Sequence, residues 1–244
     1  MLDVHPPHES VHTWRDFFVH IATICIGLLI AIALEQAVEA MHHRHERHSL
    51  EARLHDEAQR NFDLTQGNLA RLKIQLAWVN ASIVALNTAP VTNGRIRSDV
   101  LPPQGNIFDI GLFDPSQTVW AVAKASGTVG LLPEDEAQVY ARLDHEADQL
   151  TLGQGDFLRA RIAGVSARRR LQGLSAPQLE FLTFFERDTL LQILSNLSSQ
   201  YDAIITLELN ESSACRSILH GARTVDQMLH DMVNEYQLQQ SARQ

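Results

Sequence analysis

Histidine is the residue type whose placement in this chain most suggests chemistry. Nine of the 12 histidines lie in the first 55 residues, and His42, His45 and His48 follow one another at steps of three. This helical spacing can bring two imidazoles to one ion, and imidazole binds zinc, copper, nickel and haem iron. The chain has neither an H-E-x-x-H nor a C-x-x-C motif. A metal or haem site, contacts at a membrane–water interface or helix packing, and a pH response of imidazole near neutrality all stay open.

A second group of candidate residues is basic. The group comprises Arg159, Arg161, Arg168, Arg169 and Arg170, late in a predicted helical region. Such a group can bind anionic lipid headgroups or an acidic surface of a partner. It can equally form a solvated helix face that pairs with some of the 29 acidic residues.

Enzyme motifs are missing from the sequence. It has no G-x-S-x-G elbow, no phosphate-binding loop and no dinucleotide fingerprint. The two cysteines, Cys25 and Cys215, cannot form a disulfide framework, and Cys215 lies in a helical pattern typical of a small core residue. We therefore predict a protein that is not an enzyme, with no catalytic residue and no resident cofactor.

Composition narrows the class of protein further. The 244 residues carry 29 acidic and 20 basic side chains, a formal charge of −9. Nucleic-acid binders normally have the opposite balance, so we expect no nucleic-acid partner. A hydrophobic fraction of 45% with only 6% aromatic residues favours a folded, helix-rich chain over a β-sandwich.

The most apolar segment, Phe17 to Leu34, is long enough to cross a bilayer. Eighteen residues rise about 27 Å in a helix, close to the roughly 30 Å of a hydrocarbon core. His20 interrupts the run near one end, where a polar side chain can reach the headgroups. A cleaved signal peptide is the main alternative. It is disfavoured because no Lys or Arg precedes Arg15 and a helical pattern continues past the run.

Within this run, Thr23, Gly27 and Ala31 recur every four residues. Three small side chains on one face allow close approach of a second helix in lipid, although Gly and Ala are common in membrane helices generally. Glu35 continues the same face at the membrane edge.

Flanking charges give a preferred orientation. Arg15 precedes the span, whereas Arg44, Arg47 and Arg53 follow it. The positive-inside rule then favours a cytoplasmic location for the C-terminal domain.

The N-terminal part resembles a known family. The segments are DVHPPH (Asp3 to His8), WRDFFVH (Trp14 to His20), GLLIAIALEQAVE (Gly27 to Glu39) and HHRH (His42 to His45). They are similar to a family of uncharacterised bacterial membrane-anchored proteins. Trp120, Ser126-Gly127 and Tyr140 are similar to a W…SG…Y pattern in the helical domain of that family. The resemblance implies a single-pass anchor in the bacterial inner membrane and a helical domain, and it supplies no catalytic residues.

Beyond the run the helical pattern continues. Steps of three and four residues form a heptad seam made of Leu69, Leu72, Leu76, Val79, Ile83 and Leu86. The first helix is therefore predicted from about Thr13 to Asn87. The seam fits a coiled coil with another chain or one face of a bundle within this chain. We favour the bundle because the later helices need a partner.

Turn residues and helix-start signals divide the remainder. Residues 88–113 are predicted to form a loop, and no strand of useful length is expected. Predicted helices start at Asp114-Pro115 (ending at Gly127), at Pro133 to Glu136 and at Ser175-Ala176-Pro177, with a bend near Asn210 to Ser213 or at Gly221.

These patterns predict an all-α fold. A polar N-terminal segment (1–16) precedes a transmembrane helix (17–38), which continues into a long helix packed in an antiparallel bundle domain (39–244).

The leading functional hypothesis is a membrane-anchored helical scaffold or interaction protein. Its partners would be the lipid bilayer and either further copies of itself or a membrane-protein complex. The alternative hypothesis is a His-rich metal- or haem-binding module at the membrane surface.

Overall fold

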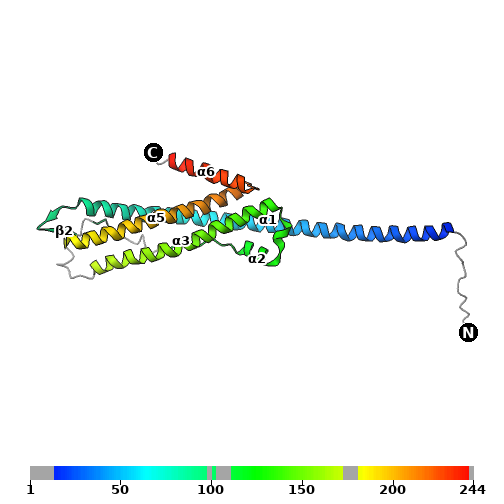
Figure 1. The fold of residues 1–244 in the computed structure, drawn as a ribbon, viewed down its shortest axis with the longest axis horizontal. Helices are drawn as coiled ribbons and strands as arrows, with labels where there is room; N and C mark the ends of the chain where they lie inside the picture. Colours follow the sequence, from blue (N-terminus) through cyan, green and yellow to red (C-terminus); the bar gives the residue numbers. More distant parts are fainter. Residues whose placement is uncertain (1–13, 98–100, 103–110, 173–180, 242–244) are drawn as a thin grey trace, which may run out of the picture. The chain divides into compact units, whose positions relative to one another are not determined.

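The computed structural model describes residues 14–97, 101–102, 111–172 and 181–241; the side chains of residues 163–181 and 239–240 lie outside this description (Figure 1). The elements are α1 (Trp14–Thr88), β1 (Val91–Thr92), β2 (Arg95–Arg97), α2 (Thr118–Ser126), the 3-10 helix η2 (Thr128–Leu131), α3 (Glu134–Gln172), β3 (Phe181–Leu182), α5 (Phe184–Leu219) and α6 (Val225–Ser241). The all-α prediction is confirmed. The chain divides into two compact units, residues 1–49 and 50–244.

The first unit contains the apolar run. It lies within α1, and its most apolar 18-residue window has a mean hydropathy of 2.6 and no residue buried within the chain. Large side chains such as Ile24, Leu29 and Leu34 are more than half exposed. Among the described residues this is the one helical segment long and apolar enough to cross a membrane.

The second unit is built on three helices: the part of α1 from Leu50 onward, α3 and α5 (Figure 1). The contacting pairs are Asn68–Glu208 and Gln75–Tyr201 between α1 and α5, and Gln154–Glu208 and Phe157–Tyr201 between α3 and α5. In both sets the numbers rise on one helix while they fall on α5. Helix α5 is therefore antiparallel to α1 and α3, which run parallel to each other.

The heptad seam of α1 faces this bundle. Leu72, Val79 and Leu86 are fully buried in one apolar cluster with residues of α3 and α5, including Leu150 and Ile204. The seam is thus covered by the chain's own helices, as the bundle interpretation predicts.

The predicted loop over 88–113 begins with a β-hairpin. Strands β1 and β2 pair antiparallel, and β2 also pairs with β3. Asn93 and Gly94 have φ of 53° and 75°, the left-handed pair that a two-residue hairpin turn requires. The strands, two or three residues long, are too short to produce an alternating pattern.

The predicted start of α2 at Asp114-Pro115 is wrong. The helix begins at Thr118 after the N-cap residue Gln117, because a carboxylate from α1, described below, binds its first turn. Its end at Gly127 is as predicted, with a left-handed φ of 76°.

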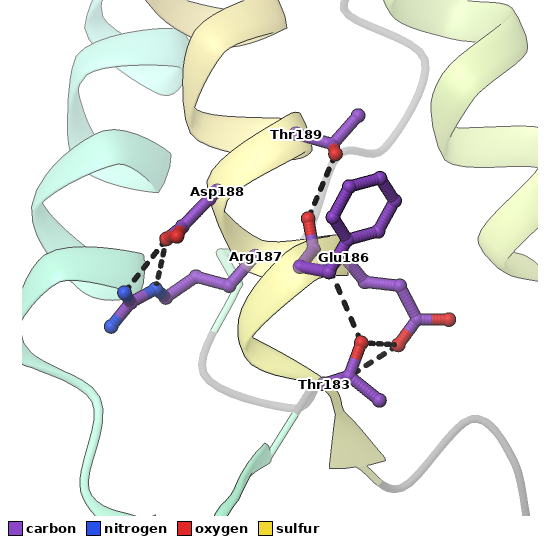
Figure 2. A network of polar contacts seen from close by, with 6 residues as sticks. Thr183, Glu186, Arg187, Asp188 and Thr189 are labelled. Atoms are coloured by element: carbon purple, nitrogen blue, oxygen red, sulfur yellow. Dashed lines mark hydrogen bonds and ion pairs between the residues drawn. The ribbon is translucent and has the colours of Figure 1, made fainter.

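The start of α5 also differs from the prediction. Ser175, Ala176 and Pro177 lie outside the described residues, and α5 begins at Phe184 with a capping box (Figure 2). Thr183 Oγ1 accepts a hydrogen bond from Glu186 N at 3.2 Å, and Thr183 N donates to Glu186 Oε2 at 2.8 Å. The helix passes through 210–213 without a break and ends at Leu219, just before Gly221, whose φ is 91°.

Helices α3 and α5 approach closely at Gly153. A Cβ atom at this position would lie 2.3 Å from Leu207 Cδ1, whereas a Cβ at Gly155 would meet nothing within 4 Å. Any other residue at position 153 therefore requires the Leu207 side chain to move.

Gly153→Leu should therefore destabilise the bundle. We expect a loss of about 1–3 kcal/mol from overpacking, measured by chemical denaturation. Gly155→Leu is the matched control on the same helix, and it should be neutral or stabilising because it removes a helical glycine without a clash. Equal losses in the two variants would contradict the close approach.

Candidate functional site

The three candidate metal ligands lie along an exposed part of α1. His42, His45 and His48 are all exposed, and His42 Nε2 lies 3.1 Å from Glu46 Oε1. Within the described part of the chain, no three or more His, Cys, Asp and Glu side chains form a group that could hold a metal ion.

The arginine group is only partly described. Arg159 is exposed and pairs with Asp156 one turn earlier on α3, and Arg161 lies close enough to Tyr201 to act on its hydroxyl electrostatically. Arg168, Arg169 and Arg170 belong to α3, but their side chains lie outside the described residues.

The small-residue strip in the apolar run is open. A Cβ added to Gly27 would meet nothing within 4 Å. Thr23 Oγ1 donates to Val19 O at 2.8 Å within the helix. The hydroxyl proton of Thr23 is therefore already in use, and its oxygen can still accept a hydrogen bond from outside.

The structure brings together a different set of polar residues, inside the bundle. Four residues of α1, spaced seven apart, are buried next to the apolar seam: Asn61, Asn68, Gln75 and Ser82. Buried amides need hydrogen-bond partners, and the partners of the first three come from elsewhere in the fold.

Two of these amides hold the connecting segment, which we define as the non-helical residues 111–117 before α2. Asn61 accepts from Ser116 N at 2.9 Å and donates to Ser116 O at 2.8 Å. Asn68 accepts from Phe113 N at 3.2 Å and donates to Phe113 O at 2.8 Å. Each amide thus satisfies both backbone groups of one residue, as a neighbouring β-strand would.

A carboxylate on α1 completes this attachment. Glu57 accepts from Val119 N at 3.0 Å and from Ser116 Oγ at 3.1 Å. An acceptor with negative charge at a helix N-terminus satisfies free N–H groups and interacts well with the helix dipole. Glu57 therefore caps α2 from a different helix.

Asn68 also connects the segment to the centre of the bundle. Its Nδ2 donates to Glu208 Oε1 at 2.9 Å, and Gln154 Nε2 donates to the same oxygen at 3.4 Å. We call Asn68, Gln154 and Glu208 the polar layer; α1, α3 and α5 contribute one residue each. Burial raises the pKa of Glu208 to about 7, against the opposing effect of these two hydrogen bonds.

A second buried carboxyl lies one turn further along α5. Glu211 has no solvent exposure, and burial raises its pKa to about 8, helped by the negative charges of Glu146 and Glu208. Within the described residues, Oε2 of Glu208 and Oε2 of Glu211 have no hydrogen-bond partner.

Cys215 packs against this carboxyl. Its Sγ donates to Glu211 Oε1 at 3.7 Å, and burial raises the pKa of the thiol well above its ordinary value. Since the thiolate is the nucleophilic form, this environment fits the small core residue that the sequence predicts.

No family model, curated protein or solved structure matches this chain. The candidate functional residues are therefore identified from the geometry described above alone. Neither the polar layer nor the buried amides of α1 were predicted from the sequence. A usable signal was present: polar residues recur at every seventh position from Asn61 to Ser82, beside the apolar seam.

Asn61→Ala should destabilise the attachment of the connecting segment. Two backbone groups of Ser116 would lose their partner, which we expect to cost about 1–3 kcal/mol in the free energy of unfolding. Asn80→Ala is the control on the same helix, since Asn80 is exposed and accepts a hydrogen bond from Ser198 Oγ. If chemical denaturation gives equal losses for both, the role assigned to Asn61 is wrong.

Proposed function

We propose that this protein is a non-catalytic, membrane-anchored helical interaction protein. One N-terminal span would hold the bundle domain at the bacterial inner membrane, where the protein would assemble with copies of itself or as an accessory subunit of a membrane complex. The observation that carries the proposal is the apolar run of α1, whose 18-residue window is nowhere covered by the chain.

Physical chemistry supports the membrane part of this proposal. A contiguous apolar surface of this size is unfavourable in water and marks a membrane or protein contact. The backbone of the run is helical throughout, so its N–H and C=O groups are satisfied without water. Three arginines after the run and one before it support a cytoplasmic domain.

The open strip of Thr23, Gly27 and Ala31 supports assembly within the membrane. Association in lipid depends on packing and polar contacts, and small residues let two helix backbones approach closely. The heptad seam of α1 is a weaker candidate for assembly, because α3 and α5 already cover it.

The metal- or haem-binding alternative has less support. No metal-holding group occurs among the described residues, and the exposed histidines of α1 suit the headgroup region equally well. Binding of anionic lipid or an acidic partner by the arginines of α3 stays a hypothesis.

The first test is extraction of membranes with alkaline carbonate. The full-length protein should stay in the membrane pellet because an inserted helix is not held by charge. Its release into the supernatant would contradict the anchor, and a peripheral membrane protein serves as the positive control for release.

The second test addresses self-assembly. Gly27→Leu puts a bulky side chain on the open strip without lowering hydrophobicity, and should weaken the oligomer by about 1–2 kcal/mol, the scale of a packing clash. Ile26→Leu is the control, since it conserves volume on the neighbouring exposed surface. Cross-linking in native membranes gives the oligomer yield. Equal yields for wild type and Gly27→Leu would remove this strip as the contact.

A further inference from the structure

The two buried carboxyl groups of α5 have no role in the proposed membrane anchoring. Glu208 and Glu211 lie one turn apart, both without solvent exposure. An isolated buried carboxylate is strongly unfavourable unless it is paired with a cation, so such groups hold a proton instead. The described residues give neither carboxyl a cationic partner in an ion pair.

The neighbours that act on the pair come from α3, the connecting segment and α1. Glu146 of α3 acts on Glu211 and is itself paired with Arg142. Asp114 of the connecting segment acts on Glu208. From α1 the neighbour is Asn68, whose Oδ1 also accepts from Arg71 at 3.4 Å.

The connecting segment is the non-helical part of this surrounding. Its residues 111–117 are not helical, and the described contacts to α1 are made mainly by side chains of Glu57, Asn61 and Asn68. Asp114, which it carries, repels an ionised Glu208. Asn68 Nδ2 donates both to Glu208 Oε1 and to Phe113 O of this segment, so water that enters to solvate the carboxylates competes for the group that holds the segment.

We propose that Glu208 and Glu211 form a proton-dependent switch: while both hold protons the connecting segment stays on α1, and loss of those protons releases it. The switch is independent of membrane anchoring, because all of its parts belong to the unit that starts at Leu50.

The direction of the pH dependence follows from the pKa values. Burial raises the pKa of Glu208 to about 7 and that of Glu211 to about 8, from 4.5. The folded state thus binds protons that the unfolded state has lost. The stabilisation is complete below the ordinary pKa and is lost as the pH rises through the two raised values.

Hydrogen exchange of the full chain in lipid nanodiscs tests this switch. Protection factors, which remove the intrinsic pH dependence of exchange, are measured between pH 5 and pH 9 for peptides covering 111–117. We expect protection of this segment to fall by about tenfold or more over that range, as the release of at least one proton requires. Constant protection would overturn the proposal.

Variants identify the groups responsible. Glu208→Gln with Glu211→Gln keeps the side-chain shape without the charge and should abolish the pH dependence. Asp202→Asn, an exposed acid on the same helix, should leave it as in wild type. Asp114→Asn removes one repelling charge, so it should lower the pKa of Glu208 and make the loss of protection at high pH smaller than in wild type.

The same pH dependence in the double variant and in wild type would overturn the proposal. If the double variant does not fold, carbon-13 titration of the carboxyl groups in wild type decides instead. Titration of Glu208 and Glu211 near the ordinary glutamate pKa would then refute the switch, and titration above pH 6 supports it.

Discussion

Burial of Glu208 at the meeting point of three helices is the constraint on which the domain depends. Its carboxyl accepts hydrogen bonds from Asn68 of α1 and Gln154 of α3. These hydrogen bonds form only when each of the three helices has one particular rotation about its axis and one position along it. A second connection, Tyr201 Oη donating to Gln75 Oε1 at 2.9 Å, lies seven residues away on both α1 and α5. Buried polar residues at a repeating position are a known means of fixing helix register at some cost in stability.

The same layer explains how a non-helical segment is held against the bundle. Helices α1 and α3 run parallel, so the chain must return along the domain between them, and the returning backbone needs hydrogen-bond partners. Asn61 and Asn68 provide them for Ser116 and Phe113. Glu57 then sets where α2 begins. Polar side chains of α1 thus supply hydrogen-bond partners for the backbone of the connecting segment. In a sheet or a helix, other backbone groups would supply them.

Much of the fold could be predicted because the deciding signals are local. The heptad seam gave α1 within a residue of its C-terminal end, Gly127 ended α2, and the acidic turn at Glu134 began α3. The start of α2 could not be predicted locally, since its capping carboxylate, Glu57, comes from another helix. The start of α5 has a local signal, since Thr183 and Glu186 have capping-box spacing, but Ser175 to Pro177 carries a competing helix-start signal nearby.

The candidate site depended on information that one sequence carries only weakly. A seven-residue recurrence of polar side chains is compatible with an exposed stripe as well as a buried one. Whether this stripe of α1 is buried depends on the packing of α3 and α5 against it. The same packing brings Glu208 next to Asn68. The histidines and arginines, in contrast, were conspicuous in the sequence, yet the described ones lie largely at the surface.

A double-mutant cycle on Asn68 and Glu208 measures how far the two side chains depend on each other in the folded domain. Asn68→Leu and Glu208→Met each leave the other side chain without the hydrogen bond that joins the two, while the double variant removes both side chains. The free energy of unfolding is measured by chemical denaturation at pH 5, where Glu208 is protonated. If the hydrogen bond between them fixes the layer, the double variant should lose less than the sum of the two single losses, by about 1–3 kcal/mol. Losses that add to within about 0.5 kcal/mol would contradict it, because independent sites behave in that way.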